Sequence, residues 1–484
     1  MQRRTDEPRA SASADEAAAA ADASDFRKPG MPPGSGAQVG AMADDPAHPT
    51  PASGAEIRAF ADEPAGATPA SGAEDRGITD EPAGAEDASG PQVQAIADAA
   101  IAATAASGPL GLVLTGGGAR GAYQVGILQW IAKRHPALSI PILTGVSAGA
   151  VNTAFLASHP GDFRRAVFDL ASLWRSLTVD KVFRSDAGSI GWKVLRWGFR
   201  LISGGARPLR DVRGFLDTVP LHKFLSRVLP NRDGVLTGIA ANIARGRLRA
   251  TAITATSYTT GQTVVFAQGS DITPWRRPQR RAEHAVLTIR HIMASAALPL
   301  FFPAVRVGDA WYGDGGMRLT APLSPALHLG AGSILAISTR YDRTTNEAEV
   351  AQHEGYPPPA QVLGSLLNSV FLDLIDQDAL RLQLINSLIG RMPPDQRDGL
   401  RPVDLLVLRP SRDLGRLSAE FEPRLPRAFR FMTRGLGTRE TNTPDVLSLL
   451  MFQPDYIDEL IAIGERDAEA RGEEIEEFIR KQKG

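Results

Sequence analysis

The chain has 484 residues, enough for one large α/β domain with additions or for two or three smaller domains, and its 43% hydrophobic residues can supply a substantial core. Its 53 basic and 54 acidic residues give a formal net charge of -1, so the overall charge gives no reason to expect nucleic acid as a partner. The sequence contains no cysteine, which excludes disulfides, thiolate catalysis and cysteine-ligated zinc.

The first 107 residues are dominated by Ala, Gly, Pro, Ser, Asp and Glu, so we predict a disordered low-complexity tail over 1–107. A degenerate repeat of 18 residues runs through this tail, because the six residues 51–56 return as 69–74. We expect no signal peptide, because no apolar run follows the charged N-terminus, and no transmembrane helix, because no window holds roughly 18 apolar residues. These features predict a cytoplasmic protein, or one bound peripherally to a membrane.

Strands and helices alternate from about residue 110 onwards. Short apolar runs predict buried strands at 110–114, 140–144, 333–338 and 403–408, and the first two precede predicted helices at 123–134 and 148–157. A hairpin is expected over 249–257 and 262–267, and further helices over 211–229, 286–297, 362–388 and 444–481. The alternation favours an α/β sheet covered by helices on both faces.

Two basic segments have more than one interpretation. Residues 190–201 place Lys193, Arg196 and Arg200 on one stripe of a helix that is otherwise apolar. This pattern suits the membrane interface or a lid over an apolar pocket, and it equally suits a core helix whose long basic side chains reach water. The group at 276–281, beside Trp275, could contact anionic head groups, but such a run is more often a solvated loop.

The motif Gly145-Val146-Ser147-Ala148-Gly149 matches the Gly-x-Ser-x-Gly nucleophile elbow. In an elbow the strand reverses so sharply into a helix that only small residues avoid clashes beside the serine. The pattern alone is weak evidence. Here it follows a predicted strand and precedes a predicted helix, which is the context that the chemistry requires, so we predict that Ser147 is a nucleophile.

A second motif, Gly116-Gly117-Gly118-Ala119-Arg120-Gly121, also lies between a predicted strand and a predicted helix. Exposed backbone N–H groups at such a place bind negative charge, either an oxyanion or a phosphate. The spacing also fits a dinucleotide-binding loop, but that site needs an acidic residue about twenty positions further on. Residues 99–161 contain neither Asp nor Glu, which argues against a nucleotide site.

A nucleophilic serine needs a base, and the spacing of residues leaves two possibilities open. Asp314, in Gly313-Asp314-Gly315-Gly316, could act directly, although the same Asp-Gly pair is also typical of a hairpin turn. Alternatively, His328 or His353 could complete a triad with Asp314. The residues around His328 indicate a histidine in a helix or in the core rather than in a catalytic loop.

Taken together and in this order, the glycine loop, the serine elbow and Asp314-Gly315-Gly316 resemble the patatin-like phospholipase family. The segment 294–303, Ala-Ser-Ala-Ala-Leu-Pro-Leu-Phe-Phe-Pro, also looks like the family's connection before the aspartate. The resemblance covers about 110–323. It implies a three-layer α/β/α sandwich with a mostly parallel central sheet in a catalytic domain at 108–342, followed by a mostly helical region at 343–484 that completes or covers the core.

The resemblance also implies a function, a lipid acyl hydrolase that cleaves phospholipids or lysophospholipids without metal or organic cofactor. Ser147 would attack the ester carbonyl and Asp314 would take its proton, without a histidine. The N–H groups of Gly116, Gly117 and Gly118 would stabilise the oxyanion, and Arg120 would order that loop or meet a phosphate. Two alternatives stay open, an α/β-hydrolase esterase with a Ser-Asp-His triad and a catalytically silent lipid-binding scaffold.

Overall fold

The computed structural model describes residues 108–184, 214–349, 356–357, 359–371, 374–397, 400–435 and 445–482. All of them belong to one compact unit of the chain, Ala85–Gly484. The predicted tail at 1–107, the basic helix at 190–201 and His353 lie outside the described residues.

The described residues form one ten-stranded sheet, in the order β10-β9-β1-β2-β3-β4-β6-β5, with β8 paired to β3 and β7 paired to β8. The strands are β1 Leu110–Leu114, β2 Ile142–Val146, β3 Ala250–Ser257, β4 Thr263–Gly269, β5 Trp275–Arg276, β6 Arg280–His284, β7 Val305–Val307, β8 Ala310–Asp314, β9 Ser333–Ile337 and β10 Asp404–Leu408.

The five neighbouring strands from β10 to β3 are all parallel, whereas β4 and β8 both run antiparallel to β3. The carboxyl ends of parallel strands lie at one edge of a sheet, which is where α/β proteins build their sites. Val146 at the end of β2 is in register with Thr254 of β3, and Ala255 of β3 is in register with Asp314 of β8. The topology therefore brings the serine elbow and Asp314 to the same edge.

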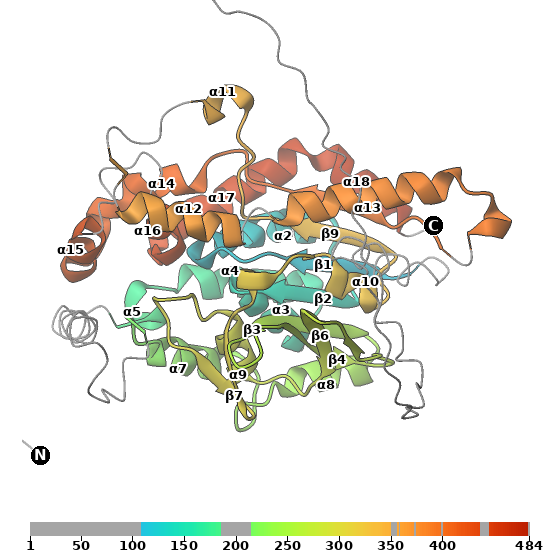
Figure 1. Ribbon diagram of the computed structural model, residues 1–484, viewed down its shortest axis with the longest axis horizontal. Coiled ribbons are helices and arrows are strands. Elements are labelled where there is room, and N and C mark those ends of the chain that lie inside the picture. Colours follow the sequence, from blue (N-terminus) through green and yellow to red (C-terminus); the bar gives the residue numbers. More distant parts are fainter. Residues whose placement is uncertain are drawn as a thin grey trace, which may run out of the picture. The chain divides into compact units, whose positions relative to one another are not determined.

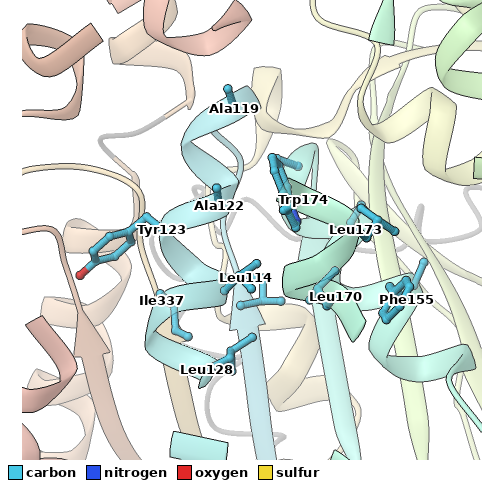
Figure 2. Close-up of a cluster of buried hydrophobic side chains, with 14 of the residues drawn as sticks. Leu114, Ala119, Ala122, Tyr123, Leu128, Phe155, Leu170, Leu173, Trp174 and Ile337 are labelled. Carbon is cyan, nitrogen blue, oxygen red and sulfur yellow. The ribbon is translucent and has the colours of Figure 1, made fainter. Parts of the chain in front are cut away.

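The sheet is buried on both faces because successive side chains of a strand point to opposite sides. Leu112 and Leu114 of β1 belong to one apolar cluster, while Val113 between them belongs to a second. Figure 2 shows part of the first cluster, in which Leu114 and Ile337 of the sheet lie near the side chains of α2 and α4. A sheet with helices on each face confirms the predicted three-layer α/β/α architecture.

The α-helices that build these layers, labelled in Figure 1 where there is room, cover the sheet and extend to the C-terminal part of the chain. They are α2 Gly121–Arg134, α3 Ala148–Ser158, α4 Phe163–Arg175, α5 Val179–Val182, α7 Val219–Val228, α8 Thr237–Ala244, α9 Ile289–Ser295, α10 Ser324–His328, α11 Thr345–Ala348, α12 Pro359–Phe371, α13 Leu374–Arg391, α14 Leu414–Phe421, α15 Arg427–Gly435, α16 Asp445–Leu450, α17 Pro454–Ala470 and α18 Gly472–Lys481. Among the described residues, no helix is long and apolar enough to cross a membrane.

Several predicted boundaries were wrong. The second strand begins at Ile142, after Pro141, and continues to Val146 at the elbow itself. The helix predicted from 211 begins only at Val219, because the preceding Phe215 and Leu216 donate backbone hydrogen bonds to the segment at 300–301 instead. The single helix predicted over 362–388 is two helices, α12 and α13.

The interpretation of Asp314-Gly315 as a hairpin turn was also wrong. The β7–β8 hairpin turns earlier, between Val307 and Ala310, and β8 then runs directly into a short 3-10 helix, η3 Gly315–Arg318. The basic group near Trp275, for which a solvated loop was the commoner interpretation, instead contributes to the short strands β5 and β6 at the end of the sheet.

Candidate active site

Ser147 lies between β2 and α3 in a backbone conformation that side chains rarely adopt, with φ 55° and ψ -122°. Such strain persists only where the surroundings enforce it. Both flanking glycines are required by close approach: a Cβ on Gly149 would lie 2.1 Å from the Leu114 carbonyl oxygen, and one on Gly145 would lie 2.3 Å from that of Gly149. The motif therefore forms the predicted elbow, for the predicted steric reason.

Ser295, at the end of α9, links the elbow to strand β3 through two hydrogen bonds. The backbone N–H of Ser147 donates to the Ser295 hydroxyl at 2.9 Å, and that hydroxyl donates in turn to the Thr254 carbonyl of β3 at 2.6 Å. Ser295 is fully buried, so these bonds face no competition from water. The place of Ser295 in the 294–303 segment of the family resemblance was the one sequence signal for this residue, and it indicated no role.

The glycine loop follows β1 at the same sheet edge. A Cβ on Gly116 would lie 3.1 Å from the Cβ of Ser147, so the loop passes directly beside this serine. Gly117 and Gly118 have φ values of 146° and 56°, which explains why glycine occupies both positions. Among the described residues, the N–H groups of these three glycines have no hydrogen-bond acceptor.

Contacts from distant segments fix the loop in place. The Thr339 hydroxyl donates to the Gly116 carbonyl at 2.5 Å, and the Thr339 N–H donates to the Thr115 hydroxyl at 3.2 Å. On the other side, the carbonyl of Leu449 in α16 packs against Gly118 so tightly that a Cβ there would lie 2.1 Å from its oxygen. The Gly116 carbonyl and the backbone of Gly118 are therefore both held by residues outside the loop.

Arg120 is buried, with 3% of its surface exposed, and its side chain is engaged by α16. Its Nη2 lies 2.6 Å from the Asp445 carboxylate, and its Nε donates to the Ser448 hydroxyl at 2.7 Å. The guanidinium therefore ties the loop to the C-terminal helices through a charge-assisted pair. Sequence reasoning missed Asp445, Ser448 and Thr339, because no local motif marks them.

Asp314 is fully buried at the end of β8. Its Oδ1 accepts the Gly316 N–H at 2.9 Å, and its own N–H donates to the Ala297 carbonyl at 3.0 Å. Burial raises the pKa of Asp314 to about 7, although the Ser147 hydroxyl and the Gly316 N–H both lower it. At neutral pH the carboxyl is therefore divided between its charged and neutral forms.

The Ser147 hydroxyl acts on the pKa of Asp314, which means that the two side chains are neighbours across the sheet edge. Among the described residues, however, Asp314 Oδ2 has no hydrogen-bond partner, so this oxygen is not bonded to the Ser147 hydroxyl in the structure. Catalytic hydrogen bonds are often long before substrate is bound. The structure thus brings together Ser147, the glycine loop and Asp314, which lie up to 198 positions apart in the sequence.

An apolar pocket opens beside Ser147. Its wall consists almost entirely of aliphatic and aromatic side chains, with Gly118 and Ser147 at one side; the others include Val151, Trp174, Leu221, Phe224, Leu298, Phe302 and Phe452. Its volume is about 60 Å³, which is room for a few methylene groups. A hydrocarbon chain fits the chemistry of this wall, and a long chain requires the pocket to widen.

Buried amides stabilise the pocket wall. The Trp174 indole N–H donates to the Asn152 side chain at 2.6 Å, and Asn152 donates to Gln124, which reaches the carbonyl of Thr115 just before the glycine loop. The pocket and the loop therefore share one hydrogen-bonded framework.

His328 lies elsewhere, on α10. Its ring stacks on Trp275 with centroids 4.6 Å apart, and burial, together with Arg280 and Arg277, lowers its pKa to about 4. The predicted position of this histidine on a helix is confirmed. Within the described part of the chain, no cluster of three or more His, Asp or Glu side chains could hold a metal ion.

The three-layer fold thus presents a serine elbow, a glycine loop and a buried carboxyl at one edge of its sheet. Residues 112–327 match the patatin-like phospholipase family, and the chain therefore carries a domain of that family. The comparison with curated proteins found no match.

Several solved structures are similar to this chain at low sequence identity. VipD from Legionella pneumophila is 15% identical with a TM-score of 0.30, over 63% of this chain and 62% of that one. Human GIVD cytosolic phospholipase A2 is 11% identical with a TM-score of 0.39, over 81% of this chain and 63% of that one. The structure of SpcU in complex with ExoU from Pseudomonas aeruginosa is 17% identical in sequence with a TM-score of 0.20, over 71% of this chain and 71% of that one. The matches span less than two thirds of the length of the first two structures.

Proposed function

We propose that this protein is a lipid acyl hydrolase that cleaves acyl esters of phospholipids or lysophospholipids, with Ser147 as nucleophile and Asp314 as base. One observation carries the proposal: a serine held in a strained elbow faces a fully buried carboxyl with a pKa of about 7, at the side of an apolar pocket. A base is most effective when its pKa lies near the working pH. The family match supports the lipid substrate.

In the proposed reaction, the Ser147 hydroxyl attacks the ester carbonyl while Asp314 takes its proton through Oδ2, the oxygen that has no hydrogen-bond partner among the described residues. The N–H groups of Gly116, Gly117 and Gly118 stabilise the oxyanion of the tetrahedral intermediate. Asp314 then returns the proton to the leaving alcohol. Asp314 next accepts a proton from a water molecule as the water oxygen attacks the acyl-serine carbonyl. It then returns that proton to the Ser147 oxygen when the ester bond breaks and the fatty acid is released.

Arg120 has the loop-ordering role in this proposal rather than the phosphate-binding one. Its guanidinium is buried and held by Asp445 and Ser448, so a substrate phosphate would have to displace a charge-assisted pair to reach it. The acyl chain occupies the pocket beside Ser147. The reaction uses side chains and backbone N–H groups alone, without metal or organic cofactor.

The test combines labelling with turnover. A fluorophosphonate probe should label the wild-type protein at Ser147, and purified protein should release fatty acid from phospholipid or lysophospholipid. Ser147→Ala should lose both, and Asp314→Asn should lose turnover, while circular dichroism shows both variants folded. Turnover retained by folded Ser147→Ala would refute the mechanism, and absence of labelling in folded wild type would favour a silent lipid-binding scaffold.

The triad alternative lacks comparable support. His328 packs on Trp275, and a pKa of about 4 would make its imidazole a weak base. His353 lies outside the described residues. Full activity in His328→Ala and His353→Ala variants would eliminate the triad, whereas loss of activity in either folded variant would restore it.

A further inference from the structure

Leu300 has an exposed side chain and a strained backbone. Among the described residues, four that are not glycine have positive φ: Ser147, Asp233, Asp271 and Leu300. Asp adopts this conformation readily, and Ser147 has it as part of the elbow. Leu300, at φ 67°, is therefore the one among these four whose strained conformation is not yet explained. Its side chain is 54% exposed. Strain of this kind marks a functional constraint when the surroundings enforce it.

The surroundings of Leu300 are those of the candidate active site. Its carbonyl accepts the Phe215 N–H at 3.1 Å, which holds the loop in place. The neighbouring Leu298 and Phe302 turn inward and line the acyl pocket, while Leu300 between them turns outward. The fold therefore holds an apolar side chain in water beside the pocket that the proposed function assigns to an acyl chain.

Two exposed aromatic residues lie close to Asp314 on the same edge. Tyr258, just after β3, donates its backbone N–H to the carbonyl of Trp311 in β8 at 2.8 Å, so the two residues are cross-strand neighbours. They are 46% and 43% exposed. The Tyr258 ring lies over Gly313, where a Cβ would meet its hydroxyl at 2.3 Å. Trp and Tyr combine an apolar ring with a polar group, as side chains at a membrane interface do.

The segment that carries these residues is rich in basic side chains, and one of them, Arg318, is exposed without a carboxylate partner among the described residues. Residues 214–327 contain 13 Lys and Arg but 6 Asp and Glu, and one of those acids is the buried Asp314. Arg318, at the end of η3, is exposed and hydrogen-bonds Gln279 at 2.9 Å, and no carboxylate pairs with it among the described residues. Each such arginine contributes measurably to binding at an anionic lipid surface.

We infer that Tyr258, Leu300, Trp311 and Arg318 form a docking rim by which the protein binds an anionic lipid surface with its active-site edge against the bilayer. This inference rests on the proposed function for its purpose, since docking by this edge would let an acyl chain pass from the bilayer into the pocket. The rim is small, with three separated apolar side chains and a cation. That composition suits shallow insertion among head groups better than a protein interface, which needs about 800 Å² from each partner.

The structure also offers a competing surface, which supplies the control. On α13, Leu380, Leu384 and Leu388 form an exposed apolar stripe at helical spacing, and they are 65%, 61% and 53% exposed. This stripe is at least as apolar as the rim, but it lies far from β3 and β8 in the sheet order, since α13 packs against the edge strand β10. A merely hydrophobic effect would involve the stripe equally.

The experiment is co-sedimentation of the full chain with vesicles of phosphatidylglycerol mixed with phosphatidylcholine, compared with phosphatidylcholine alone. We expect a preference for the anionic vesicles that salt weakens. The double variant Leu300→Asn/Trp311→Ser should bind roughly tenfold more weakly, and Arg318→Gln roughly fivefold. Leu384→Ser should bind as wild type does.

Two further measurements separate docking from folding and from chemistry. Asn tolerates positive φ better than Leu, so Leu300→Asn should unfold at the same or a higher temperature than wild type while it binds vesicles less well. Hydrolysis of a soluble short-chain ester should be unchanged in all rim variants, because none touches the reacting atoms. Failure of that hydrolysis in wild type would count against the proposed function, not the rim. Unchanged binding of the double variant, or an equal loss in Leu384→Ser, would overturn the rim.

Discussion

Replacing Asp314 by Asn should destroy activity and should stabilise the fold by an amount that grows as the pH rises from about 4 to about 7. Burial raises the pKa of Asp314 to about 7 in the folded protein, whereas an unfolded chain has an Asp pKa of about 3.9. Because the folded state holds this proton more tightly, stability from this group is complete below the unfolded pKa and is lost as pH rises to the folded pKa. Asn keeps the shape and removes the charge.

The two pKa values set the size of the effect. At about pH 5 the unfolded carboxyl has already ionised and the folded one has not, which destabilises wild type by about 1–2 kcal/mol relative to a neutral side chain. At about pH 8 both have ionised, and the difference reaches about 4 kcal/mol. All other ionisable groups are the same in wild type and in Asp314→Asn. The difference between their unfolding free energies therefore reports on residue 314.

Urea unfolding of wild type and of Asp314→Asn at these two pH values measures the difference between their unfolding free energies directly. We expect the advantage of the Asn variant to grow by about 2–3 kcal/mol between about pH 5 and about pH 8. Asp376→Asn provides a control, because that carboxylate is paired with Arg340 and Arg409 and should show no such gain. If the difference in unfolding free energy stays constant with pH, the pKa of Asp314 is not raised, and Asp314 would not be a base tuned to neutral pH.

Three further outcomes follow from the same site. In a pH–rate profile for a soluble ester, kcat/KM should fall about tenfold per pH unit below about pH 7 as Asp314 becomes protonated, and a profile flat down to about pH 5 would contradict its role as base. Gly118→Ala should abolish turnover and lower the unfolding free energy by about 1–3 kcal/mol, because the new Cβ would lie 2.1 Å from the Leu449 oxygen; wild-type activity and stability would be inconsistent with this packing. Asp445→Ala should lower the unfolding free energy by about 3–5 kcal/mol, since it leaves Arg120 buried without its partner, and an unchanged denaturation midpoint would rule out that pair as a stabilising contact.

The sequence predicted what depends on neighbouring residues. The elbow requires small residues on both sides of Ser147, and the close contacts of Gly145 and Gly149 show why the motif can be recognised without a structure. Likewise, the alternation of apolar runs with helices predicted β1, β9 and β10, because strands buried on both faces have nearly continuous apolar sequences.

The errors arose where a distant segment determined the local structure. Asp314-Gly315 has the composition of a hairpin turn, but β8 pairs with β3 and the Asp314 carboxylate accepts the Gly316 N–H, which begins a 3-10 helix instead. Similarly, residues 215–216 follow the backbone of the 300–301 segment rather than a helix. Neither partner can be identified from the local sequence.

The same argument explains why motifs reveal only part of this site. The segment 112–327 that matches the family contains Ser147, Asp314 and the glycine loop. The contacts that shape the loop come from outside that segment, from the Thr339 hydroxyl, the Leu449 carbonyl and the Asp445 carboxylate. The contact from Leu449 is made by its backbone carbonyl, which any residue at 449 would provide, so the identity of residue 449 does not reveal it. The only sequence feature that reflects this contact is the glycine at 118. The serine elbow can be found from five consecutive residues, but the geometry of the loop beside it depends on helices that lie more than 300 positions away.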